Sequence, residues 1–220
     1  MSRSLRRHAL VVALLVAVGM TACGRQAPST SPEALVSEAS TLLDQNKAQE
    51  ALDLLNKALA RADSAKGRYL LGNAYSELER FEEAQAAYLK ALELDPAYAD
   101  ARSNLAVAYY MLGRPAEAEE TIRQVLSEHP QDADLHYNLG TVLAAQGRTA
   151  EAEAAFLEAR RLDDSLPQVY LGLGVLYRDM GRPEEAMASL RRYLELSDDA
   201  TWRAEAERIL NELETISGSK

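Results

Sequence analysis

A pattern of small and aromatic residues returns every 34 residues along most of this chain. One small residue recurs four times at this interval, at Gly72, Ala106, Gly140 and Gly174. An alanine further along each unit recurs at the same interval, at Ala84, Ala118, Ala152 and Ala186. A fixed period of this length is typical of stacked supersecondary units that each pack on their neighbours, and not of one globular core.

The spacing within one period predicts two helices. The first would carry its packing face at positions i, i+1 and i+4, which one unit fills with Leu71, Gly72 and Tyr75. The second would carry its packing face at i, i+4 and i+7, filled by Ala84, Tyr88 and Ala91. The small residues would let the two helices approach closely, and the large ones would fill the space between adjacent units.

A turn is expected between the two helices of each unit. Three units place a glycine followed by an arginine at this point, at Gly113, Gly147 and Gly181. Glycine permits the left-handed residue that ends a helix, and a proline two residues later would suit the first turn of the next helix. In the first unit Asn46 stands at the turn, and asparagine tolerates the same conformation.

This pattern resembles the tetratricopeptide repeat (TPR), a unit of two helices with the same period. One unit matches its consensus at Leu71, Gly72, Tyr75, Ala84, Tyr88, Ala91 and Pro96. The usual tryptophan position is filled instead by Arg68, Arg102, His136 and Tyr170, and two units close with Asp164 and Asp198 in place of proline. The resemblance implies an all-α solenoid, a right-handed superhelix of antiparallel helix pairs, with about five repeats and a C-terminal capping helix.

The period sets the expected bounds of the repeats. A degenerate first repeat is expected at 32–64, and regular ones at 65–98, 99–132, 133–166 and 167–200. A capping helix at 201–216 would cover the last repeat, because its apolar side gathers Trp202, Ala206, Ile209, Leu210 and Leu213. Large aromatic side chains tend to be buried, so we expect Trp202 to lie in the core of this cap.

The segment at 1–22 is interpreted as a targeting signal. Three arginines precede an uncharged apolar run at 9–18, which is too short to span a membrane comfortably. The sequence Met20-Thr21-Ala22-Cys23 then resembles the lipobox of bacterial lipoproteins. That resemblance implies cleavage before Cys23, a diacylglyceryl thioether on its sulfur and an acylated amine. The alternative is a secretory signal followed by an incidental cysteine.

The segment at 23–31 would form a flexible polar tether between the lipid and the first repeat. Gly24 follows the cysteine, whereas an aspartate there retains lipoproteins at the inner membrane of enterobacteria. We therefore expect a lipid-anchored protein of the bacterial cell envelope, on the periplasmic face of the outer membrane.

Composition and motif searches exclude several functions. The formal net charge is −10, and the segment at 1–22 holds three arginines and no acids, so the rest stands at −13. A chain so acidic has no general affinity for nucleic acid or anionic membrane surfaces. No catalytic constellation, metal-ligand spacing or glycine-rich phosphate loop is present, and a single cysteine forms no intramolecular disulfide. We therefore expect no enzyme and no cofactor beyond the acyl modification of Cys23.

The first helices of a helix-pair solenoid line its concave surface, which is the remaining candidate site. The candidate groove residues are Lys66, Tyr69, Asn73, Asn104, Tyr110, Tyr137, Asn138 and Arg178. Asn104 and Asn138 lie one full period apart, so we expect them to stack as a ladder that pairs with the backbone of an extended peptide.

Two known TPR sites resemble parts of this set. The asparagine pair resembles the ladder of O-linked N-acetylglucosamine transferase. Asn73 resembles an asparagine of the carboxylate-clamp repeats, although Tyr69 stands where the clamp has a lysine.

The sequence thus predicts a lipid-anchored TPR scaffold that binds a protein or an extended peptide in its groove. One alternative is an assembly factor for an envelope machine, pilotin-like, such as a type IV pilus or secretin complex. Another is a non-catalytic subunit of an envelope enzyme. A third is self-association through the apolar positions Val107, Met111 and Leu171.

Overall fold

The computed structural model describes residues 31–218, and the side chains as far as residue 215. All regular structure in this part of the chain is helical. The helices in chain order are α1 (Pro32–Asp44), α2 (Ala48–Leu59), α3 (Ala65–Glu77), α4 (Phe81–Leu94), α5 (Ala99–Met111), α6 (Pro115–Glu128), α7 (Ala133–Ala145), α8 (Thr149–Leu162), α9 (Pro167–Asp179), α10 (Pro183–Leu196) and α11 (Ala200–Gly218). The expected all-α solenoid is confirmed.

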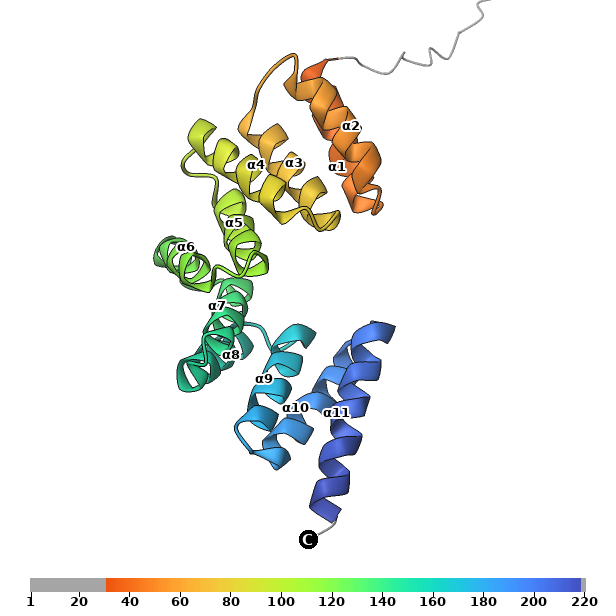
Figure 1. The fold of residues 1–220 in the computed structure, drawn as a ribbon, viewed down its shortest axis with the longest axis vertical. Coiled ribbons are helices and arrows are strands. Elements are labelled where there is room, and N and C mark those ends of the chain that lie inside the picture. Colours follow the sequence, from red (N-terminus) through yellow and green to blue (C-terminus); the bar gives the residue numbers. More distant parts are fainter. Residues whose placement is uncertain (1–30, 219–220) are drawn as a thin grey trace, which may run out of the picture.

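Consecutive helices form antiparallel pairs, and the pairs stack into an arc (Figure 1). Helix α6 lies on the outer side of this arc, while α5 and α7 lie towards its inner side. Helix α11 packs on α10 at the far end from α1. The expected signal segment, Cys23 and all of the tether but Ser31 lie outside the described residues. Within the described range, none of the helices combines the length and the apolar character that a membrane crossing requires.

The two helices of a repeat approach closely at the recurring small residue. A Cβ added to Gly72 would lie 2.3 Å from the ring of Tyr88, and one added to Gly140 would lie 2.6 Å from the ring of Phe156. Both aromatic residues are almost fully buried, with 1% and 2% of their surface exposed. The aromatic side chain of the second helix therefore occupies the space that a side chain on the first helix would need.

Each turn between paired helices contains one left-handed residue. The backbone φ is +70° at Gly113, +74° at Gly147 and +70° at Gly181, and Asn46 has φ of +57° as expected. Glu79 occupies the same place in the second repeat with φ of +57°. A residue with a Cβ is strained in this conformation by roughly 1–2 kcal/mol, so Glu79 is a weak point of the solenoid.

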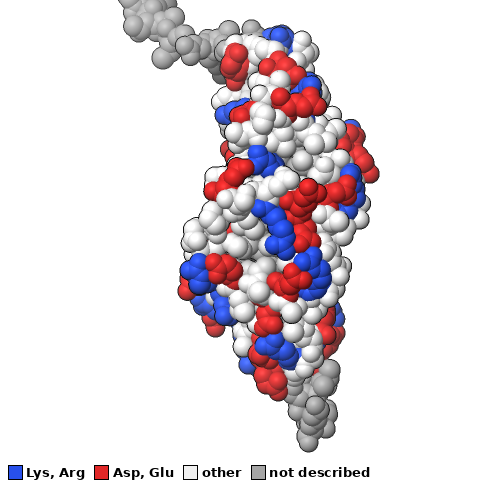
Figure 2. Space-filling model, turned by 90° about the vertical axis from the view of Figure 1, so that its left-hand side faces the viewer, with Lys and Arg blue, Asp and Glu red and all other residues white. Residues whose placement is uncertain are grey.

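An arginine follows every one of the last four turns and joins neighbouring elements. Each forms an ion pair with the glutamate three residues on, as Arg80 does with Glu83 at 2.5 Å. Three of them also stack on a tyrosine ring of the preceding helix, with guanidinium carbons 4.4–4.7 Å from the ring centroids. Figure 2 shows the result on one face, where basic and acidic side chains alternate and no large patch carries a single sign.

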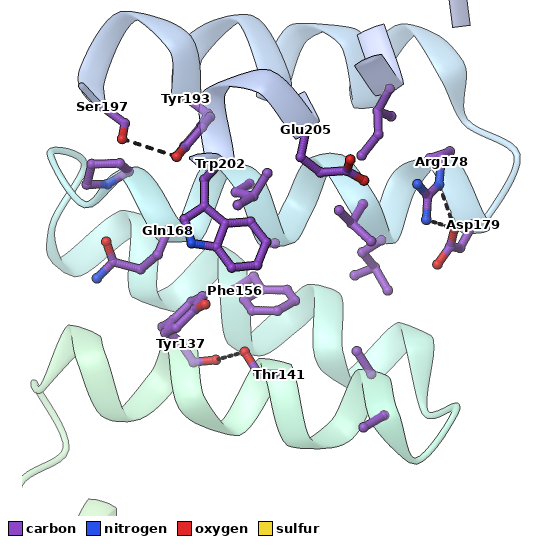
Figure 3. A pocket seen from close by; sticks show the side chains of 18 of the residues that line it. Tyr137, Thr141, Phe156, Gln168, Arg178, Asp179, Tyr193, Ser197, Trp202 and Glu205 are labelled. Atoms are coloured by element: carbon purple, nitrogen blue, oxygen red, sulfur yellow. Dashed lines mark hydrogen bonds and ion pairs between the residues drawn. The ribbon is translucent and has the colours of Figure 1, made fainter. Parts of the chain in front are cut away.

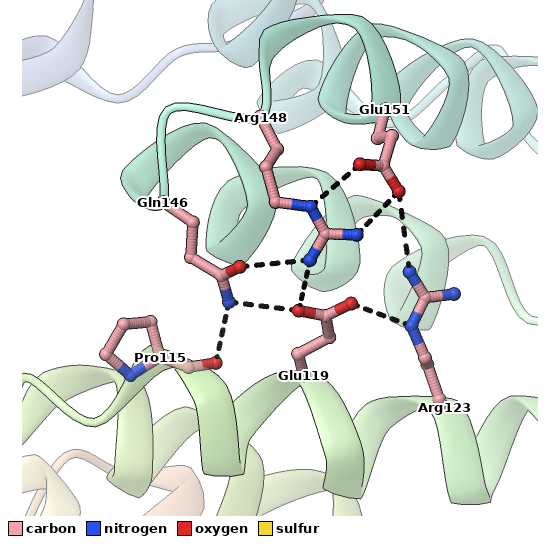
Figure 4. Close-up of polar contacts among 6 residues, drawn as sticks. All are labelled: Pro115, Glu119, Arg123, Gln146, Arg148 and Glu151. Atoms are coloured by element: carbon pink, nitrogen blue, oxygen red, sulfur yellow. Dashed lines mark hydrogen bonds and ion pairs between the residues drawn. The ribbon is translucent and has the colours of Figure 1, made fainter.

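Glu119 on α6 connects two repeats through one of these arginines (Figure 4). It accepts hydrogen bonds from Arg148 at 2.6 Å, from Gln146 at 3.0 Å and from Arg123 at 2.9 Å. Burial alone would raise the pKa of Glu119, but the hydrogen bonds that it accepts outweigh burial and hold this pKa below its ordinary 4.5. The carboxylate is thus charged at neutral pH and stabilises the interface.

We expect Glu79→Gly to raise the free energy of unfolding by about 0.5–1 kcal/mol, because relief of the left-handed strain outweighs the extra backbone entropy of glycine in the unfolded chain. Urea denaturation followed by circular dichroism measures this change. The converse change, Gly113→Ala, should lower stability by about 1 kcal/mol, because no atom crowds that Cβ position and only the backbone conformation changes. A Glu79→Gly variant no more stable than the parent would show that the turn is unstrained.

We expect Glu119→Gln to lower the free energy of unfolding by about 1–2 kcal/mol at pH 7. The pKa of Glu119 is depressed by folding, so its contribution is complete above about pH 4.5 and is lost as the pH falls through the lower folded value. The difference between parent and variant should therefore shrink below pH 4.5 in denaturation curves measured across pH.

Glu120→Gln is the matched control, because Glu120 is the exposed neighbour on the same helix. It should change stability by less than about 0.5 kcal/mol. If Glu119→Gln lowers the free energy of unfolding by the same amount down to about pH 3, the charge of Glu119 does not stabilise the interface.

Candidate functional site

A groove of about 750 Å³ opens on the inner side of the C-terminal half of the arc (Figure 3). Helices α5, α7, α8, α9, α10 and α11 contribute side chains to it. Its lining includes Tyr110, Tyr137, Thr141, Phe156, Pro167, Gln168, Leu171, Gly172, Val175, Leu176, Arg178, Asp179, Tyr193, Asp199, Trp202, Glu205 and Ile209. A cavity of this size has room for several bulky side chains of a partner.

The floor of the groove is apolar and belongs to the core. Phe156, Leu176 and Ile209 line the groove and are buried in the core. The ring of Tyr137 lies 5.8 Å from that of Phe156, centroid to centroid. Burial raises the pKa of the Tyr137 hydroxyl, so this group stays neutral in the physiological range. The floor offers a contact surface without charge.

Gly172 keeps the groove open above this floor. It lies inside α9, where a glycine costs roughly 1 kcal/mol relative to alanine. A Cβ at this position would lie 3.0 Å from the ring of Phe156, and a longer side chain would extend into the groove. Gly172 follows Asn138 by one full period, so the glycine interrupts the series of asparagines at that position. That interruption is visible in the sequence, but the repeat period alone does not indicate a site there.

Trp202 contradicts the expectation that it lies in the core of the cap. Its side chain is 54% exposed and lines the groove, with the indole above Phe156 and Tyr137 (Figure 3). Ala206 and Ile209 on the same face of α11 are buried as expected. Trp202 lies in the first turn of α11, where this face is directed into the groove. Its indole N–H has no hydrogen-bond partner among the described residues.

Charged and polar groups surround the apolar floor. Arg178 forms an ion pair with Asp179 at 2.8 Å, and Glu205 accepts a hydrogen bond from Arg208 at 2.8 Å. This hydrogen bond lowers the pKa of Glu205, which is therefore ionised at neutral pH. The groove is thus an uncharged floor with a rim of ionised groups, an arrangement suited to binding and orienting a polypeptide.

The other residues predicted from the sequence are divided between several places. Tyr110, Tyr137 and Arg178 line the C-terminal groove. Asn73 and Asn104 line a second hollow of about 260 Å³ further towards the N-terminus. Lys66, Tyr69 and Asn138 line neither of these hollows. Tyr69 instead packs its ring against Tyr98 at 5.0 Å and Tyr88 at 6.2 Å, centroid to centroid.

Asn104 and Asn138, expected to form a ladder for a peptide backbone, differ in their contacts within the protein. Asn104 donates from Nδ2 to Oδ1 of Asn73 at 2.9 Å, and the buried Tyr88 hydroxyl donates to the same oxygen at 2.9 Å. Asn104 and Asn73 lie 31 positions apart, whereas Gln168 and Asp134, which also bond between neighbouring first helices, lie one full period apart. At Asn138 the residue at the same offset is Val107, which has no side-chain acceptor. Asn138 accordingly has no hydrogen-bond partner for its side chain in the described structure.

Among the described residues, no group of histidine, cysteine and acidic side chains could hold a metal ion.

Repeat families match most of the described chain. The family model described as TPR repeat matches residues 72–113, and the one described as tetratricopeptide repeat matches residues 112–167 and 137–201. A model described as subunit 3 of the anaphase-promoting complex, or cyclosome, matches residues 9–91. No curated protein matches the chain.

Solved structures share the fold at low identity. TTC0263, a thermophilic TPR protein of Thermus thermophilus, is 24% identical, with 82% of this chain and 99% of that chain covered and a TM-score of 0.72. YrrB, described as a TPR protein with an unusual peptide-binding site, is 23% identical, with 81% and 93% covered and a TM-score of 0.60. MamA from Desulfovibrio magneticus RS-1 is 20% identical, with 79% and 100% covered and a TM-score of 0.66. At these identities the likeness extends to the fold alone.

We expect Asn104→Ala to be less stable than Asn138→Ala by about 1 kcal/mol, because only the first loses a hydrogen bond between repeats. Both changes replace asparagine by alanine inside a first helix, so the gain in helix propensity is the same and cancels in the comparison. The free energies of unfolding from urea denaturation check this difference. Equal stabilities would mean that the bond between Asn104 and Asn73 contributes nothing.

Proposed function

Because the chain belongs to the tetratricopeptide repeat family, we propose that it is an adaptor that binds a segment of a partner protein in its C-terminal groove. Proteins with this fold are in general non-catalytic scaffolds for protein–protein interaction. The observation that carries the proposal is the exposed Trp202 above a preformed apolar floor. Tryptophan is among the residues that contribute most to binding when a partner covers them.

The geometry of the groove supports this proposal energetically. Covering apolar surface stabilises a complex by about 25 cal/mol per Å², and an aromatic side chain can bury about 150–250 Å². The walls are helices fixed in the core, so little conformational entropy is lost when a partner binds. YrrB, which shares the fold, is described as having an unusual peptide-binding site, and this description agrees with the proposed kind of partner.

We further propose that Cys23 carries the lipid that anchors the adaptor to the bacterial envelope. The support comes from the lipobox-like residues before it, which lie outside the described part of the chain. Helix α1 lies at the opposite end of the arc from α11, the helix that carries Trp202 (Figure 1). A lipid at the N-terminus would therefore leave the groove accessible to a partner away from the membrane surface.

The proposal predicts position-specific crosslinking in native membranes. A photo-crosslinking residue at Leu171 should capture one defined partner, because this side chain lines the groove. The same residue at Ser127, which is exposed on α6 and outside the groove, should capture none above background. Mass spectrometry of the crosslinked product identifies the partner.

The lipid anchor is tested in the cells from which these membranes are prepared. Radiolabelled palmitate should enter the parent chain and not a Cys23→Ser variant. Absence of label in the parent would overturn the anchor. Identical products from Leu171 and Ser127, or none from either, would overturn the groove as the binding site.

A further inference from the structure

The chemistry of the groove limits which kind of partner segment fits it. An inference about this segment rests on the function proposed above. Trp202, Tyr137 and Phe156 surround the same space, and Gly172 leaves that space unfilled from α9 (Figure 3). Leu171 and Val175 complete the apolar wall. This part of the groove matches a large apolar side chain, because a small or polar one would leave aromatic surface in contact with water.

The charges next to this space are unevenly compensated. At one end Asp179 is paired with Arg178 at 2.8 Å, so little net charge is left there. Gln168 and Trp202 both line the other end of the groove (Figure 3), and Gln168 donates to Asp134 at 3.2 Å. Gln168 is neutral, so the negative charge of Asp134 is not cancelled by its partner.

Asp199 adds a second carboxylate at the same end. It accepts two hydrogen bonds from backbone N–H groups at the start of α11, those of Thr201 at 2.9 Å and Trp202 at 3.2 Å. Arg203, four residues on, donates instead to the carbonyl oxygens of Leu194 and Ser197. The end of the groove beside Trp202 therefore combines an apolar surface with two carboxylates, Asp199 in its lining and Asp134 bonded to the lining residue Gln168, and neither forms an ion pair with a cationic side chain among the described residues.

We infer that the groove takes a cationic peptide segment, one that carries a large apolar side chain next to lysine or arginine. The apolar side chain lies between Trp202 and Gly172, and the cation lies towards Asp134 and Asp199. Opposite charges at the edge of an apolar contact raise the association rate and select the partner. An acidic segment would place its charges against these carboxylates and would be rejected.

Trp202 is the only tryptophan in the chain, so its fluorescence reports directly on occupation of the groove. The full chain is titrated with three short synthetic peptides of equal length. One has leucine and phenylalanine flanked by lysines, the second has the same apolar residues flanked by glutamates, and the third has serines between lysines. We expect a saturable blue shift with the first, at least tenfold weaker binding of the second and no shift with the third.

Matched variants separate the two parts of the inference. Asp134→Asn should weaken the lysine-flanked peptide about threefold and flatten the salt dependence of its binding. Asp100→Asn, the same change one period earlier on α5, should leave binding unchanged. Trp202→Ala, read by anisotropy of a labelled peptide, should weaken binding tenfold or more, whereas Trp202→Phe should retain most of it. Circular dichroism checks that each variant keeps its helices.

The outcomes distinguish this inference from the proposed function. Equal binding of the lysine-flanked and glutamate-flanked peptides would overturn the charge selection, while crosslinking from Leu171 would still identify the groove as the binding site. Equal binding of the serine peptide would overturn the apolar contact. If none of the peptides shifts the fluorescence of Trp202, the inferred ligand class is wrong. A partner crosslinked at Leu171 would then show that the groove binds another kind of segment.

Discussion

The close contact between the two helices of each repeat is the interaction on which the rest of the structure depends. At Gly72 and Gly140 the first helix has no side chain, and the rings of Tyr88 and Phe156 occupy the space. Any side chain there would push the helices apart and change the angle at which the next pair stacks. Because every repeat contacts only its neighbours, such changes would accumulate along the arc and alter the shape of its inner surface.

The two halves of that inner surface differ in what they leave available to a partner. Towards the N-terminus Asn73, Asn104 and Tyr88 bond to one another, so their polar groups are largely used within the protein. Towards the C-terminus the groove presents Trp202, whose indole N–H has no partner among the described residues, above an apolar floor. Binding energy is therefore available chiefly in the second half, since satisfied polar groups gain little from a new partner.

The sequence predicts local features of this fold well and contacts between repeats poorly. The helix pairs and the left-handed turn at Asn46 follow from spacing and residue type within one unit. The bond between Asn104 and Asn73 depends on how far one repeat is displaced along the next, and the repeat period does not contain this quantity. The exposure of Trp202 likewise depends on where the last repeat stops covering α11. Tyr137 and Arg178 could be predicted as groove residues because their direction is set by their own helix.

Two residues of the groove depart from what stability alone would favour, and both line the same space. Gly172 lies in the middle of α9 at a cost of roughly 1 kcal/mol, although an alanine would be the better helix former. Trp202 exposes more than half of the largest side chain in the chain, although burial is what a tryptophan ordinarily contributes to a fold. Departures from local rules tend to mark functional sites, because folding alone gives no reason for them. Their meeting across one space makes the capping helix part of the proposed binding surface as well as the end of the core.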